Sequence, residues 1–115
     1  MSTLFQTFRR AEYYAREEAW ADAVVDAQAV VEEVPHDRAA RELLARAYFH
    51  IAALGRAREQ IEWLLERDPS DAYARELYVR VLERTGERDL AREHRRVLAV
   101  LTGRDDDAAP HVPMG

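Results

Sequence analysis

Apolar side chains return every three or four residues in six successive stretches of this chain. Leu4, Phe8, Ala11 and Ala15 show the pattern in the first stretch, with polar residues at most positions between them. This spacing places apolar residues on one face of an α-helix, which turns once every ~3.6 residues. No window alternates apolar and polar residues as a half-buried strand does. The predicted helices span residues 4–17, 20–34, 38–52, 55–67, 72–84 and 88–102.

Proline, aspartate and glycine residues mark the ends of these helices. Pro35 ends the second helix, because proline disfavours the helical conformation in the residue before it. Asp37 then stands where a side chain can accept a hydrogen bond from the first turn of the third helix. Pro69 follows the fourth helix in the same way, with Ser70 or Asp71 as the next cap. A glycine follows the fifth helix, where it can adopt a positive φ.

The two internal prolines lie 34 residues apart, and this period relates the helices in pairs. Small residues recur at the same period where two helices would approach closely, and larger apolar residues fill the space beside them. The recurring residues are Ala11, Ala45 and Val79 in the first helix of each pair and Ala23, Ala57 and Ala91 in the second. One pair cannot bury its apolar face alone, so we expect the pairs to stack and share a core.

By its period, its alanines and its prolines, the chain resembles the tetratricopeptide-repeat (TPR) family. The resemblance implies an all-α fold of three repeats, over residues 4–37, 38–71 and 72–103. These would stack as antiparallel helix-turn-helix units in a right-handed superhelical array. The chain departs from the family pattern at several positions. Thr7, Arg41 and Arg75 occupy its tryptophan position, and Gly103 stands where a third proline is expected. Another all-helical hairpin array is the alternative fold.

The composition indicates a single helical domain. The chain has 115 residues, of which 48% are hydrophobic and 34% charged, so it is too apolar to remain unfolded. It contains no cysteine, which excludes disulfides, thiolate metal sites and cysteine nucleophiles. All 17 basic residues are arginine, a usage typical of a GC-rich bacterial genome. The net charge of −5 argues against general nucleic-acid binding.

Neither end of the chain shows a targeting or membrane segment. Residues 1–14 lack the basic and apolar regions of a signal peptide. No uncharged apolar run approaches the roughly 20 residues that a membrane helix needs. We therefore expect a cytoplasmic protein. Residues 104–115 are acidic, contain prolines and show no periodicity, and we expect them to form a disordered tail.

Few residues have the spacing that catalysis requires. The histidines His36, His50, His94 and His111 show no metal-ligand spacing. The two serines lie near the N-terminus and at a helix cap, and the glycines are isolated. Neither a serine nucleophile nor a phosphate-binding loop is therefore expected. We expect no enzyme activity, no metal and no cofactor.

The resemblance also implies a binding site. In the TPR family the first helix of each repeat lines a concave groove that grips a peptide. The predicted function is therefore non-catalytic protein–protein interaction, in which the groove binds a peptide segment of a cytoplasmic partner. The groove positions are Phe5, Phe8, Glu12, Ala15 and Arg16 in the first repeat, Ala39, Glu42, Arg46, Phe49 and His50 in the second, and Tyr73, Glu76, Arg80, Glu83 and Arg84 in the third.

Two interpretations of these groove residues stay open. Arg46 and Arg80 share one repeat position and are expected to be neighbours, where they could bind an acidic peptide while aromatic residues anchor it. Alternatively, three of the arginines pair with the glutamate four residues before them, as Glu12–Arg16, Glu42–Arg46 and Glu76–Arg80. The aromatic residues would then belong to the core or to the packing between repeats. Chaperone-binding members of the family use lysine and asparagine in the groove. The chain has neither, so that mode of binding is not expected.

The last predicted helix raises a second candidate function. Its run Val97–Leu101 is apolar all round, whereas a terminal helix should show water a polar face. We expect its apolar side to be covered by another copy of the protein, by the tail or by a further helix. The residues expected to be covered are Leu90, Val97 and Leu101, and those expected in solvent are Arg92, Arg95 and Arg96. A homodimer built on this helix or on the groove is the alternative function.

Overall fold

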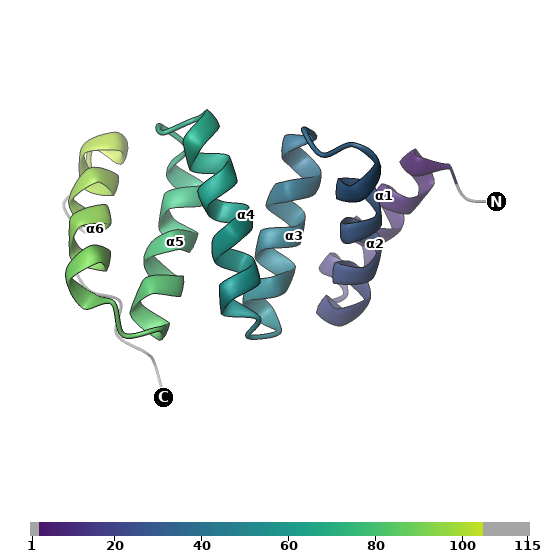
Figure 1. Ribbon diagram of the computed structural model, residues 1–115, viewed down its shortest axis with the longest axis horizontal. Coiled ribbons are helices and arrows are strands. Elements are labelled where there is room, and N and C mark those ends of the chain that lie inside the picture. Colours follow the sequence, from purple (N-terminus) through teal and green to yellow (C-terminus); the bar gives the residue numbers. More distant parts are fainter. Residues whose placement is uncertain (1–2, 105–115) are drawn as a thin grey trace.

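The computed structural model describes residues 3–104, which form six α-helices and no strand (Figure 1). Helix α1 spans Leu4–Arg16, α2 Trp20–Glu33, α3 Arg38–His50, α4 Leu54–Arg67, α5 Ala72–Arg84 and α6 Arg88–Thr102. Each helix begins and ends within two residues of its predicted position. The all-α fold class is confirmed. The predicted tail lies outside the described residues, apart from Arg104.

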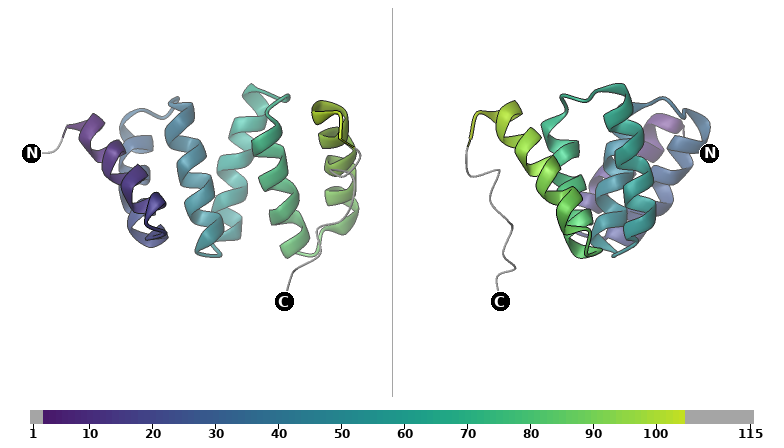
Figure 2. Two further views of the ribbon diagram at one scale, coloured as in Figure 1. Left: turned by 180° about the vertical axis from the view of Figure 1, so that it is seen from behind. Right: turned by 60° about the vertical axis from the view of Figure 1, so that its left-hand side comes forward.

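The helices pair along the chain, α1 with α2, α3 with α4 and α5 with α6, and the pairs stack side by side (Figure 1). Helices α1, α3 and α5 form one layer, and α2, α4 and α6 form the other (Figure 2). Helix α2 also packs on α3, and α4 on α5, which joins each pair to the next. The result is an elongated helical-repeat array of 48 × 33 × 22 Å, with α1 and α6 toward opposite ends.

The core is built from the small residues that recur at the repeat period. Because these residues have short side chains, the helices approach closely, and Leu44, Ile61 and Leu82 fill the space beside them. The packing interpretation of the pattern is therefore confirmed. The small residues that are fully buried are Ala11, Ala23, Ala45, Ala57, Val79 and Ala91.

Helices α3 and α5 begin at aspartates. The carboxylates of Asp37 and Asp71 each accept a hydrogen bond from the backbone N–H three residues further on, at 2.9 and 3.0 Å. These bonds satisfy donors that the first turn of a helix leaves without an intrahelical partner. Asp71 rather than Ser70 is the cap of α5, because the Ser70 hydroxyl donates to Asp68 instead.

A residue in the left-handed conformation follows α1, α3 and α5 at one repeat position. Its φ is 58° at Glu18, 61° at Ala52 and 83° at Gly86. The residue after each of them donates its backbone N–H to a carbonyl five residues earlier, at 2.8–2.9 Å. This bond turns the chain sharply toward the next helix. The sequence predicted the turn only where the residue is glycine.

Arg95 is buried, so the prediction that it lies in solvent is wrong. It occupies the same repeat position as Ala27 and Ile61, both of which belong to the core. Its guanidinium forms an ion pair with Glu83 of α5, which compensates the charge inside the protein. The same ion pair joins α5 to α6.

Candidate functional site

A groove of about 920 Å³ opens between α1 and α3, in the layer formed by α1, α3 and α5. Phe8 and Ala15 of α1, Ala39 and Leu43 of α3, and Trp20 at the start of α2 give it an apolar lining. Its charged lining consists of Arg9, Arg16, Arg38 and Arg46 together with Glu12 and Glu42. Arginines outnumber carboxylates there, so the groove favours a ligand with negative charge and some apolar surface.

Trp20 links the groove to the far end of α3. Its ring stacks on His50, with 4.0 Å between ring centroids and an angle of 7° between the planes. The guanidinium of Arg46 lies 5.6 Å from the centroid of the Trp20 ring. A cation over an indole face is attracted by the ring quadrupole, so Trp20 holds the Arg46 side chain beside the groove.

Arg16 and Arg46 line this groove without an acidic partner among residues 3–104. The buried Nε atom of Arg46 also has no hydrogen-bond partner in that part of the chain. Burying a donor without a partner costs free energy. A carboxylate placed in the groove could accept bonds from the outer nitrogens of such a guanidinium.

The alternative interpretation, intrahelical pairing, holds for only one of the three predicted pairs. Arg80 lies 3.1 Å from Glu76, as that interpretation predicts. Glu12 instead approaches Arg9, at 3.7 Å. The pairing interpretation is therefore confirmed for Arg80 and wrong for Arg16 and Arg46.

The pKa of His50 is lowered, first by partial burial and then by the positive charge of Arg46. The charge of Arg80 lowers it further, whereas Glu18 raises it. Both arginines thus act on the same imidazole. Because its pKa is lowered, His50 is neutral at pH 7. The imidazole that stacks on Trp20 therefore does not repel the guanidinium of Arg46.

The structure brings some of the predicted residues of α1 and α3 together in the groove, and none of those of α5. Phe8, Glu12, Arg16, Glu42 and Arg46 line the groove. At the far end of α3, His50 stacks on the groove residue Trp20, and the guanidinium of Arg84 of α5 lies 5.3 Å from the centroid of the Phe49 ring. The predicted residues outside the groove lining are Phe5, Phe49, His50, Tyr73, Glu76, Arg80, Glu83 and Arg84.

The groove lining also contains four residues that were not predicted to face it: Arg9, Trp20, Arg38 and Leu43. Trp20 was assigned only to the start of the second helix, and no repeat spacing connects it with α3. Arg38 is held by ion pairs to Asp68, at 3.7 Å, and to Asp71. It therefore contributes a fixed charge at the rim, unlike Arg46.

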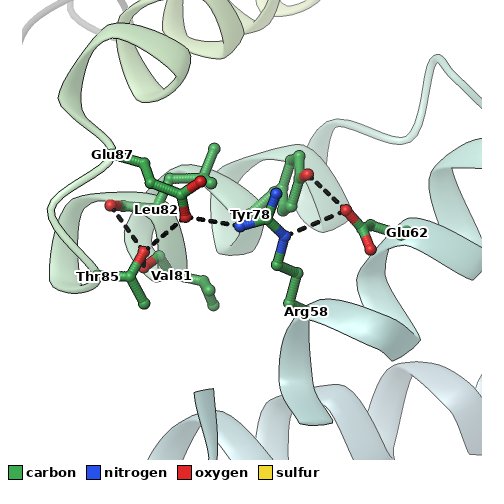
Figure 3. A network of polar contacts seen from close by, with 7 residues as sticks. All are labelled: Arg58, Glu62, Tyr78, Val81, Leu82, Thr85 and Glu87. Carbon is green, nitrogen blue, oxygen red and sulfur yellow. Dashed lines mark hydrogen bonds and ion pairs between the residues drawn. The ribbon is translucent and has the colours of Figure 1, made fainter. Parts of the chain in front are cut away.

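A polar network fixes the third helix pair against the second (Figure 3). Arg58 of α4 pairs with Glu62 at 3.2 Å and with Glu87, just before α6, at 2.6 Å. The Tyr78 hydroxyl of α5 donates to Glu62 at 2.8 Å, and Thr85 donates to Glu87 at 3.0 Å. Burial raises the pKa of Tyr78, and the carboxylate of Glu62 raises it further. The network thus connects α4 with α5 and with the residues between α5 and α6.

Three apolar residues of α6 are exposed in the described part of the chain. Leu90 is half-buried, but Val97 and Leu101 are exposed, and Val100 between them is 82% exposed. The prediction that something covers this face is therefore not met by residues 3–104 themselves.

No group of three or more histidine, aspartate or glutamate side chains among residues 3–104 could hold a metal ion. No helix in this range is long and apolar enough to cross a membrane.

The fold, rather than the sequence, connects this chain with known proteins. No family model and no curated protein matches it. The first TPR domain of Spaghetti (RPAP3), bound to the HSP90 peptide SRMEEVD, matches with a TM-score of 0.81 at 12% identity, over 91% of this chain and 83% of that one. The TPR2B domain of yeast Sti1, in a complex with pHsp70, matches with a TM-score of 0.78 at 15% identity, over 92% and 85%. The fold is therefore that of TPR domains, as the sequence resemblance predicted.

Proposed function

We propose that this chain, which has the TPR fold, is a non-catalytic protein-interaction module. Its groove between α1 and α3 would bind a peptide segment of a partner protein. The observation that carries this proposal is the placement of Arg16 and Arg46. Both line the groove without an acidic partner among the described residues. We expect the partner to be a cytoplasmic protein, because the sequence predicts a cytoplasmic location for this chain.

The chemistry of the groove favours an acidic peptide with one apolar anchor. A carboxylate of the peptide would bind Arg46 bidentately, and Arg16 would add a second positive charge. An apolar side chain would pack on Phe8 and Leu43. Glu42 lies in the same lining and would repel a second carboxylate of the peptide. The peptide would therefore bind with its carboxylate at Arg46 and an uncharged residue at Glu42.

The two structural neighbours support the class of ligand without identifying it. Both are complexes, one with an HSP90 peptide and one with pHsp70. The same fold can therefore hold a ligand of this kind. Since the present chain has no lysine and no asparagine, we assign its recognition to arginines instead.

A displayed random-peptide library selected on the wild-type protein supplies the probe for a test. We expect Arg16→Glu/Arg46→Glu to weaken binding of the selected peptides about tenfold or more, because both charges of the groove are reversed. Arg56→Glu/Arg88→Glu is the matched control. It changes the net charge equally at two exposed arginines outside the groove lining and should bind as the wild type does. Equal binding by the groove variant and the wild type would refute the proposal.

Self-association is a separate candidate function. It rests on the exposed apolar residues of α6 and not on the groove, so the two can hold together.

A further inference from the structure

A run of three aspartates in this chain complements the charge of the groove between α1 and α3. Four arginines and two glutamates line the groove, and Arg16 and Arg46 have no acidic partner among residues 3–104. Residues 105–107, just beyond α6, are all aspartate, and they form the longest acidic run in the sequence. Opposite charges on two surfaces favour their association and fix its orientation.

The residues that follow these aspartates suit the rest of the groove lining. Residues 108–115 include two alanines, a valine and a methionine, and they contain no acidic residue and no arginine. Beside its arginines the groove offers the apolar side chains of Phe8 and Leu43, and it offers Glu42, which would repel a carboxylate. A segment with its carboxylates together and uncharged residues next to them therefore matches both parts of the lining.

The length of this segment also fits. Arg46 and Ala39 both line the groove and lie seven residues apart on α3, which corresponds to about 10 Å along the helix. An extended peptide covers this distance in about three residues, at roughly 3.3 Å each. With Asp107 at Arg46, the two alanines that follow it come to lie beside Glu42 and Ala39.

The aspartates do not reach the groove of their own copy. Among the six described helices, α6 packs only on α5, which packs on α3, and the groove lies beyond α3, toward α1 (Figure 1). Packed helix axes lie about 8–10 Å apart, so these two steps amount to roughly 20 Å. Three residues beyond Arg104 extend at most about 11 Å. The aspartates that enter a groove must therefore come from another copy.

We propose that residues 105–109 of one copy bind in the groove of a second copy, with aspartate carboxylates on Arg46 and Arg16. This inference rests on the proposed function, since it names a peptide segment that the groove binds. The contact joins two different surfaces, so every pair of copies still has one empty groove and one unbound run of aspartates. Such a head-to-tail contact adds further copies and forms chains or a ring.

Sedimentation equilibrium over a concentration series of the whole chain tests the proposal. Between about 5 and about 500 µM, the average mass should rise from 13.3 kDa to more than twice that value. Raising the salt concentration from about 0.05 to about 0.5 M should weaken the association about tenfold or more, because salt screens charges. A mass that levels off at twice the monomer and resists salt would overturn the proposal, since it would indicate a two-fold dimer through an apolar surface such as α6.

Two variants that fail in different halves of the contact give the sharper test. Arg16→Glu/Arg46→Glu keeps the aspartates but loses the groove charges, and Asp105→Asn/Asp106→Asn/Asp107→Asn keeps the groove but loses the aspartates. Each variant alone should stay monomeric. An equimolar mixture should form dimers and nothing larger, because one intact groove meets one intact aspartate run. The aspartate variant changes no residue of the six helices, so its result does not depend on a tolerated change in the fold.

Glu33→Gln/Glu59→Gln/Glu66→Gln is the matched control for the aspartate variant. It removes three negative charges from exposed positions outside the groove lining and should associate as the wild type does. A wild type that stays monomeric, or an aspartate variant that still associates, would overturn the proposal. If selected library peptides still bind the groove in that case, the proposed function stands and only the second copy as partner is refuted.

Discussion

One position of the repeat carries a different polar residue in each helix pair, and each of these residues binds an arginine of the helix before it. The pairs are Arg10 with Asp26, Arg41 with Gln60 and Arg75 with His94, at donor–acceptor distances of 2.7, 3.0 and 2.7 Å. A carboxylate, an amide and an imidazole thus accept the same kind of bond. The position tolerates chemical change because the guanidinium can donate to any of the three.

Two of these arginines, Arg41 and Arg75, stand at the position where the TPR pattern has tryptophan. Arg41 also donates to the backbone carbonyl of Pro35 at 2.9 Å, and Arg75 donates to that of Pro69 at 2.8 Å. One side chain therefore ties the first helix of a repeat both to its second helix and to the loop that precedes it. The departure from the pattern replaces an apolar contact by a hydrogen-bonded one.

His94 makes this contact sensitive to pH. The pKa of His94 is lowered, first by burial and then by the charge of Arg75, while Glu93 raises it and Arg58 lowers it further. Protonated imidazole cannot accept the bond from Arg75, so folding favours the neutral form. The contribution of the Arg75–His94 contact to the free energy of unfolding is complete above the pKa of the unfolded state, about 6.5. It is lost as the pH falls toward the lower pKa of the folded state.

The substitution His94→Gln should remove this part of the acid sensitivity, because Gln60 accepts the equivalent bond without titrating. Urea unfolding at pH 7.5 and pH 5 should show a smaller loss of stability for the variant than for the wild type, with His50 contributing to the loss that remains. An equal loss in both proteins would show that the Arg75–His94 contact does not titrate.

At the scale of elements, the same left-handed turn ends the first helix of every pair, with a different residue at its centre each time. A non-glycine residue with positive φ is strained by about 1 kcal/mol, because its Cβ approaches the neighbouring carbonyl. Gly86 avoids this strain, whereas Ala52 has a φ of 61° and Glu18 one of 58°. The turn is therefore set by the packing of the helix pairs and not by the residue.

The substitution Ala52→Gly should accordingly raise the free energy of unfolding, by roughly 0.5–1 kcal/mol. Ala53→Gly is the control. Its φ is −83°, so glycine relieves nothing there and only increases the freedom of the unfolded chain. Urea denaturation should move the two midpoints in opposite directions. A lower midpoint for Ala52→Gly would contradict the assignment of strain to this turn.

At the scale of the molecule, periodicity and turn residues predicted the six helices and the fold, because both signals are local in the sequence. The repeat period also predicted which residues of α1 and α3 face the groove, among them Phe8, Arg16 and Arg46. This transfer worked because equivalent residues of stacked repeats occupy equivalent places.

The remaining features depend on contacts between elements, which no local pattern encodes. Trp20 enters the groove from the neighbouring helix and stacks on His50. Arg95 looked like a solvent residue by its charge, but its repeat position is a core position, and Glu83 of another helix compensates the charge. The state of Arg16 and Arg46, without acidic partners among residues 3–104, likewise followed from packing and not from spacing.

The molecule has two surfaces with different chemistry. The groove is lined by arginines and apolar residues near the N-terminal end, and helix α6 at the other end exposes Val97, Val100 and Leu101.

The central claim is that a peptide binds between α1 and α3, and backbone amide chemical shifts test it most directly. Titration of the labelled protein with the tightest peptide from the library should shift residues facing the groove, including Glu12, Arg46 and the indole N–H of Trp20. The outer faces of α2, α4 and α6 should remain unchanged. Shifts confined to those outer faces, with Arg46 and Trp20 unmoved, would contradict the account.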